Sequence, residues 1–179
     1  MLYNSCLIAL VLFALNCSHP NENTPAEIGK SEIPKDVNYK LLFTQQHAEK
    51  ILGEAVMLKD SSTQITKSVS TFSCSYSALA MDTVSGKTGV VYVMFQQFSK
   101  ASDAEKTYTS IKKDNEGHEG VETIKDLGDE AYFHSDHQNF YFILVRKAGK
   151  VFRMKVNKIT SHTSQSDFNS VAREITAAM

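Results

Sequence analysis

The residue types best suited to chemistry lie in the segment His134-Ser135-Asp136-His137. Two imidazoles three positions apart beside a carboxylate can hold a metal ion if the segment forms a helical turn. Ser135, Asp136 and His137 also have the side chains of a hydrolytic triad, but triad members are brought together from distant segments, so adjacency carries no weight. We interpret the segment as an exposed loop between two apolar stretches. We therefore expect no catalytic residue, no metal ligand and no cofactor.

A second histidine-bearing segment, Glu116-Gly117-His118-Glu119, is likewise interpreted as a solvated loop. If His118, His134 and His137 met in one pocket with neighbouring carboxylates, the chain could be an envelope hydrolase or a metal-dependent enzyme. That remains the alternative to a non-catalytic function, and it depends on the His134/His137 loop.

Cys17 ends an apolar run, Leu7 to Leu15, near the start of the chain. Nine apolar residues are about half of the ~20 that a helix needs to cross a bilayer, but they match the ~7–15 of a secretory signal. The tetrapeptide Ala14-Leu15-Asn16-Cys17 resembles the cleavage box of bacterial lipoprotein precursors, although Asn16 stands where Gly, Ala or Ser is usual. A plain secretory signal with an incidental cysteine is the other interpretation.

The resemblance implies that residues 1–16 are a lipoprotein signal peptide and that Cys17 is the site of lipid attachment. Two or three long acyl chains on Cys17 anchor a protein stably, whereas a single myristoyl chain binds a membrane only marginally. We expect a protein exported and lipid-anchored to a bacterial membrane, with the choice of inner or outer membrane left open.

Residues 17–36 are predicted to be a disordered tether. All three prolines of the chain, Pro20, Pro25 and Pro34, lie there among polar residues, a composition that buries too little apolar surface to order itself. Residues 37–179 are then a single domain. The formal charge of −1, from 19 basic and 20 acidic residues, gives no electrostatic case for nucleic acid.

Cys74 is left without a partner if Cys6 is removed with the signal peptide and Cys17 is lipidated. Phe72, Cys74 and Tyr76 alternate with serines, so they share one face of a strand. We expect Cys74 to be a small buried side chain and not a reactive thiol.

The periodicity of the rest of the chain predicts three helices. The first begins at Thr44 and ends at Gly53, the second has a capping box formed by Ser102 and Glu105, and the last begins near Ser164 or Ser166. Strands are predicted near residues 72–76, 90–98, 131–133, 140–146 and 150–156. The strand at 90–98 is apolar on both faces, which indicates a central position covered from two sides.

This order predicts an α+β domain: a single antiparallel sheet of about five to seven strands with helices packed against it. Three segments, Ile51-Leu52-Gly53, Cys74-Ser75-Tyr76 and residues 126–133, resemble small exported lipoproteins with a Mog/PsbP-like domain, over Thr44 to Met179. The resemblance implies a binding or assembly role and brings no functional residues. We expect a non-catalytic module that binds an envelope protein or a small apolar ligand, with the aromatic run Phe140-Tyr141-Phe142 beside the site.

Overall fold

The computed structural model describes residues 38–179, which lie within one compact unit. The predicted signal peptide, Cys17 and the tether up to residue 36 lie outside the described residues. The described part has seven strands: β1 (Val56–Ile65), β2 (Val69–Ala78), β3 (Val90–Phe98), β4 (Val121–Ile124), β5 (Glu130–Ser135), β6 (Phe140–Lys147) and β7 (Lys150–Asn157). Its helices are α1 (Tyr39–Leu42), α2 (Gln45–Leu52), α3 (Ala101–Asp114) and α4 (Gln165–Ala178).

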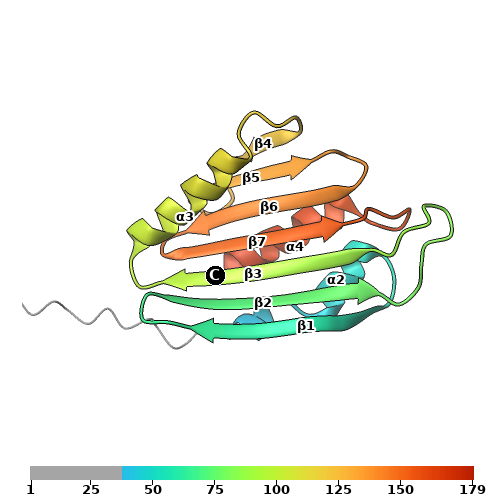
Figure 1. Cartoon of the computed structure of the whole chain (residues 1–179), viewed down its shortest axis with the longest axis horizontal. Coiled ribbons are helices and arrows are strands. Elements are labelled where there is room, and N and C mark those ends of the chain that lie inside the picture. The colour runs from blue at the N-terminus through green and yellow to red at the C-terminus, as the bar shows by residue number, and fades with distance from the viewer. Residues whose placement is uncertain (1–37) are drawn as a thin grey trace, which may run out of the picture. The chain divides into compact units, whose positions relative to one another are not determined.

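The seven strands form one antiparallel sheet in the order β1-β2-β3-β7-β6-β5-β4 (Figure 1). The last strand in the chain, β7, lies in the middle of the sheet, between β3 and β6. The prediction of an α+β domain with one antiparallel sheet is confirmed, at the upper end of the expected number of strands.

Helices lie on both faces of the sheet. In Figure 1, α3 crosses in front of the sheet, while α2 and α4 lie behind it. Successive side chains of a strand point to opposite faces of the sheet, so each face presents apolar side chains to the helices that cover it. Phe152 belongs to the core under α2 and α4, and its neighbour Val151 belongs to the smaller core under α3.

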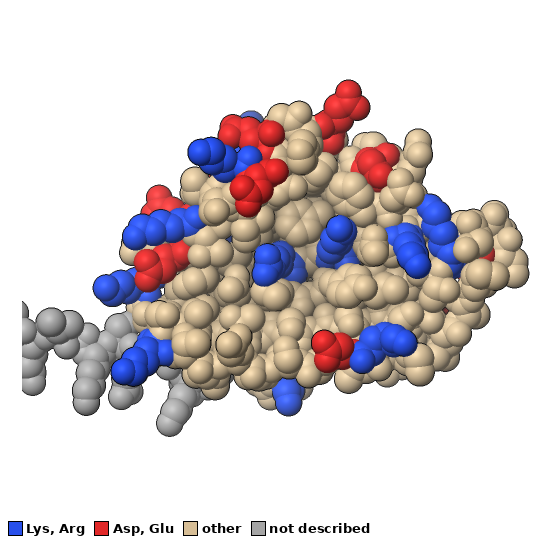
Figure 2. All heavy atoms as spheres, in the orientation of Figure 1, with Lys and Arg blue, Asp and Glu red and all other residues tan. Residues whose placement is uncertain are grey.

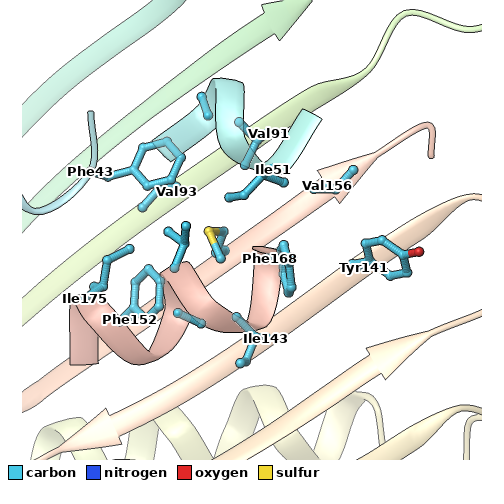
Figure 3. Close-up of a cluster of buried hydrophobic side chains, with 14 of the residues drawn as sticks. Phe43, Ile51, Val91, Val93, Tyr141, Ile143, Phe152, Val156, Phe168 and Ile175 are labelled. Carbon is cyan, nitrogen blue, oxygen red and sulfur yellow. The ribbon is translucent and has the colours of Figure 1, made fainter. Parts of the chain in front are cut away.

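The larger core is the one between the sheet and the helices α2 and α4 (Figure 3). Ile51 of α2 and Phe168 of α4 are fully buried against strand residues such as Val93 and Phe152. The rings of Phe95 and Phe152 stack with their centroids 5.0 Å apart across the β3–β7 pair. This packing joins segments from both ends of the described chain.

The predicted ends of α2 and α4 are confirmed, and the predicted start of α3 is wrong. The Thr44 side chain accepts a hydrogen bond from the His47 backbone, and Gly53 ends α2 in the left-handed region at φ 71°. Ser164 caps α4. For α3 the predicted capping box is wrong: Lys100 is the N-cap residue, with no side-chain hydrogen bond, and Ser102 lies inside the helix. The Ser-x-x-Glu motif begins two residues after the N-cap position, so Ser102 cannot form the cap.

The serine and threonine spacing from Ser61 to Ser70 predicts a turn and a polar strand edge, but not the full extent of strand β1. It is a ten-residue edge strand with Val56 buried and the other nine residues exposed. A register shift between Leu58 and Asp60 interrupts its pairing with β2. Because side chains on both faces of β1 are exposed and its register shifts, the strand lacks the alternation of apolar and polar residues by which a strand is recognised in a sequence.

Candidate functional site

Helix α3 covers only part of its face of the sheet. Tyr108 is buried under the helix against Tyr132, Leu144 and Val151. The rings of Tyr108 and Tyr132 meet edge to face with centroids 6.2 Å apart. The rest of this face, over β1, β2 and the adjoining parts of β3, β7 and β6, lies beside the helix, and we call it the open face.

A hollow of about 390 Å³ lies on the open face, within the ~300–1,000 Å³ of small-molecule sites. Register places its side chains in two neighbouring rows across the strands. One row runs Asp60, Ser75, Tyr92, Lys155 and Phe142, and the other runs Ser73, Met94 and Arg153. Figure 2 views this face and shows basic side chains in its middle, among uncharged ones.

The hollow combines apolar surface with two cations. Tyr92 is 46% exposed, and the half-buried Met94 and Phe142 also line the hollow. Arg153 is half-buried, and burial lowers the pKa of its guanidinium. The Lys155 ammonium lies 5.3 Å from the centroid of the Phe140 ring, a cation–π geometry. The arrangement is suited to a ligand with an apolar body and a negative charge.

This site does not follow from the sequence, because the apolar pattern of Val90–Phe98 predicts a strand that is covered on both faces. The strand itself is confirmed, but helix α3 leaves Tyr92 exposed. In the sequence, Phe152, Met154 and Val156 alternate with Arg153, Lys155 and Asn157, which predicts a strand with one solvated face, as β7 has. That alternation is the signal that points to Arg153. Of the aromatic run expected beside a site, Phe142 lines the hollow and Tyr141 is buried in the core, 8% exposed.

The segment from His134 to His137 is divided between the end of β5 and the turn that follows it. Ser135 is fully buried; its hydroxyl donates to the carbonyl of Phe140 at 2.7 Å and accepts from the backbone N–H of His137 at 2.8 Å. Desolvation opposes ionisation of the exposed Asp136, but hydrogen bonds from Asn139, Gln138 and the backbone of Phe140 hold its pKa well below the usual range. These side chains shape the β5–β6 turn.

His134 was expected in a loop and instead lies in strand β5, where it meets His118. The two imidazole rings have centroids 5.8 Å apart. Burial, and then the neighbouring His118, lower the pKa of His134. His137 lies in the exposed turn at φ 58°. Within residues 38–179, no three or more His, Cys, Asp or Glu side chains are grouped closely enough to hold a metal ion.

Cys74 is a free, buried thiol on the core side of β2, as predicted. Burial raises its pKa to about 11, so the thiolate is rare at neutral pH. Its neighbours Ser73 and Ser75 lie on the opposite face, toward the hollow.

A second hollow of about 310 Å³ lies between the turn before β5 and the end of α4. Two of its charged groups, Asp129 and Lys147, have partners within the protein. The Asp129 carboxylate accepts from Arg146 at 2.9 Å and from the backbone of Ala148 at 2.7 Å, and the Lys147 ammonium donates to the carbonyl of Thr176 at 2.8 Å. These bonds join both the turn before β5 and the end of α4 to the β6–β7 hairpin. The open face is therefore the better candidate site.

No protein-family model matches the chain, and no curated protein or solved structure is similar enough to count as a relative. Among the described helices, none has the length and apolarity to cross a membrane.

Proposed function

We propose that this protein is a non-catalytic binding module whose ligand occupies the hollow on the open face. The observation that carries the proposal is the exposure of apolar side chains on a central strand, Tyr92 above all. Helix α3 does not cover this part of the sheet. Exposed apolar surface gathered in a concave site is typical of binding surfaces.

The hydroxyl groups of the hollow support binding more than catalysis. Ser73 shares a hydrogen bond with the Ser62 hydroxyl at 2.8 Å. Within the described part of the chain, no histidine or carboxylate accepts a hydrogen bond from Ser73, Ser75 or Tyr92. Nucleophilic catalysis by a hydroxyl needs such a base within reach.

The alternative, a hydrolase or metal-dependent enzyme, requires His134 and His137 to act together. His134 faces His118 instead, while His137 lies in the following turn. The geometry therefore favours the binding module.

The proposal extends to the N-terminal segment. We propose that the chain is exported, that Cys17 carries the lipid, and that the tether presents a Mog/PsbP-like domain at a bacterial membrane, where its partner is an envelope protein or a small apolar ligand. The lipobox-like residues 14–17 support this placement. Expression of the precursor in a bacterial host with a palmitate analogue should label the protein, and Cys17→Ala should abolish the label. Label that persists on Cys17→Ala protein contradicts the anchor.

Binding in the hollow can be tested with the neutral fluorescent probe Nile red. We expect a saturable rise in fluorescence, and a Kd at least about fivefold weaker for Tyr92→Ser, since burial of an aromatic side chain contributes on the order of 1.5–3 kcal/mol. The matched control is Ile65→Ser, which removes an apolar side chain that is 73% exposed and lies at the far end of β1. No saturable signal, or equal losses in the two variants, contradicts the proposal.

A further inference from the structure

Arg153 occupies the centre of the sheet with no anionic partner. On the open face it lies between Met94 of β3 and Leu144 of β6. Its Nε donates to the Met94 sulfur at 3.2 Å, a weak acceptor. Within residues 38–179, no carboxylate forms an ion pair with its guanidinium.

Arg146, on the neighbouring strand β6, provides the contrast. Its guanidinium donates to Glu130 at 2.6 Å and to Asp129 at 2.9 Å. The fold thus supplies two carboxylates to one arginine of this face and none to the other. Removing a charge from water without a partner is costly, and burial does lower the pKa of Arg153.

The carboxylate that lines the hollow is too far away to serve Arg153. Asp60 lies on edge strand β1, and β2 and β3 separate it from β7. At the usual spacing between strands this is about 14 Å. The exposed Lys155 adds a second positive charge in the adjoining row. The positive field in the middle of the hollow is therefore not neutralised by the protein itself.

We infer that the hollow selects an amphiphilic monoanion, a single carboxylate on an apolar body, with the carboxylate on Arg153 and the body against Tyr92, Met94 and Phe142. This inference rests on the proposed binding function and names its ligand class. A guanidinium matches a carboxylate through two parallel hydrogen bonds. The apolar side chains beside Arg153 exclude water from that pair, which strengthens it.

The test is competition against Nile red by two ligands of equal chain length, octanoate and octanol. For the wild-type chain we expect octanoate to bind at least about tenfold more tightly than octanol, because only the carboxylate forms charge-assisted hydrogen bonds with Arg153. In Arg153→Met the preference should fall to within about threefold, and Arg153→Lys should be intermediate. Lys59→Met removes one positive charge from the exposed edge strand, and it should keep the full preference.

A second measurement separates a ligand contact from a structural role. Because Arg153 has no anionic partner to lose and its acceptor, the Met94 sulfur, is a weak one, Arg153→Met without ligand should unfold at the same or a higher temperature than the wild type. A lower melting temperature, equal binding of octanoate and octanol by the wild type, or a preference that survives in Arg153→Met overturns the inference. If the inference is overturned but Tyr92→Ser still weakens Nile red binding, the proposed binding function is retained. Absence of any saturable binding overturns both.

Discussion

The Asp82 carboxylate accepts a hydrogen bond of 2.8 Å from the backbone N–H of Ser161, which lies 79 positions further along the chain. The same buried carboxylate accepts from the backbone of Val84 at 3.0 Å and from the hydroxyl of Ser85 at 2.6 Å. Asp82 thus shapes the loop between β2 and β3 and joins it to the segment that leads into α4. A single charged side chain determines how two connections meet.

Replacing Asp82 by Asn should destabilise the fold. Both carboxylate oxygens of Asp82 accept hydrogen bonds, and the amide of Asn would place an NH₂ donor against one of these donor groups. The Ser161 backbone, and then the Ser85 hydroxyl, hold the pKa of Asp82 far below its usual range. A depressed pKa contributes stability above the unfolded-state pKa of about 3.9, and this contribution is lost as the pH falls through the folded-state pKa. Thermal melts should therefore show the largest difference between wild type and Asp82→Asn at neutral pH, shrinking below about pH 4. A constant difference over that range contradicts the mechanism.

Gly120 permits the close approach of β4 to the end of β5. Its φ is 76°, and a Cβ there would lie 1.9 Å from the carbonyl oxygen of Ser135. Gly117 has a φ of 84° with nothing within 4 Å, which makes it a matched control. We expect Gly117→Ala to cost about 1–2 kcal/mol for the left-handed backbone alone. The added overlap should bring Gly120→Ala to about 2–5 kcal/mol. Urea unfolding measures both, and equal losses would mean that the overlap is relieved without cost.

The elements with strong periodicity could be predicted from the sequence. Helix α4 follows from the spacing of Phe168, Val171, Ala172 and Ile175, which are all buried. Strand β7 and its wet face follow from simple alternation. The full extent of strand β1 did not follow, because an exposed edge strand with a register shift has no apolar periodicity by which it can be recognised.

The candidate site could not be predicted for a different reason. Tyr92, Phe142 and Lys155 come from three strands, and only the register of β3, β7 and β6 places them in one row. The exposure of Tyr92 depends on which part of the sheet α3 covers. That is a property of tertiary packing, and local residue patterns do not predict it. The contact between His118 and His134 likewise depends on the pairing of β4 with β5.

Replacing His118 by Gln should raise the pKa of His134. Burial is the first cause of its depression and remains, so the rise should be partial and stop below the ordinary value of about 6.5. The ring signals of His134 in an NMR pH titration measure it. His137→Gln, in the exposed turn, is the control and should leave the titration unchanged. A fall in the His134 pKa in His118→Gln, or no change, contradicts the assigned cause.

The depressed pKa of His134 also has a consequence for folding. The folded state disfavours the charged imidazole, so the contribution of His134 to stability is full above the unfolded-state pKa of about 6.5 and is lost as the pH falls through the folded-state pKa. The free energy of unfolding should therefore decrease on acidification in this window. His134→Gln should flatten that dependence, as urea unfolding at a series of pH values can show. An unchanged slope in His134→Gln contradicts the assignment.

Cys74 should react with iodoacetamide only when the chain unfolds. With its pKa raised to about 11, its thiolate fraction at pH 8 is about 0.1%, against about a quarter for an ordinary thiol of pKa ~8.5. In a chain with Cys6 and Cys17 replaced by Ser, native Cys74 should therefore label at least about 100-fold more slowly than the same chain in guanidinium.

The matched control uses the cross-strand neighbour of Cys74. Ser61 pairs with Cys74 in the sheet and is exposed on edge strand β1, so the double variant Cys74→Ser/Ser61→Cys should label at nearly the unfolded rate without denaturant. Ser73 and Ser75 face the hollow, while the Cys74 side chain belongs to the core on the other face of β2. Labelling of native Cys74 within about tenfold of the control would mean that β2 opens readily, and that the floor of the hollow is not the rigid surface that the packing of Phe72, Cys74 and Phe95 indicates.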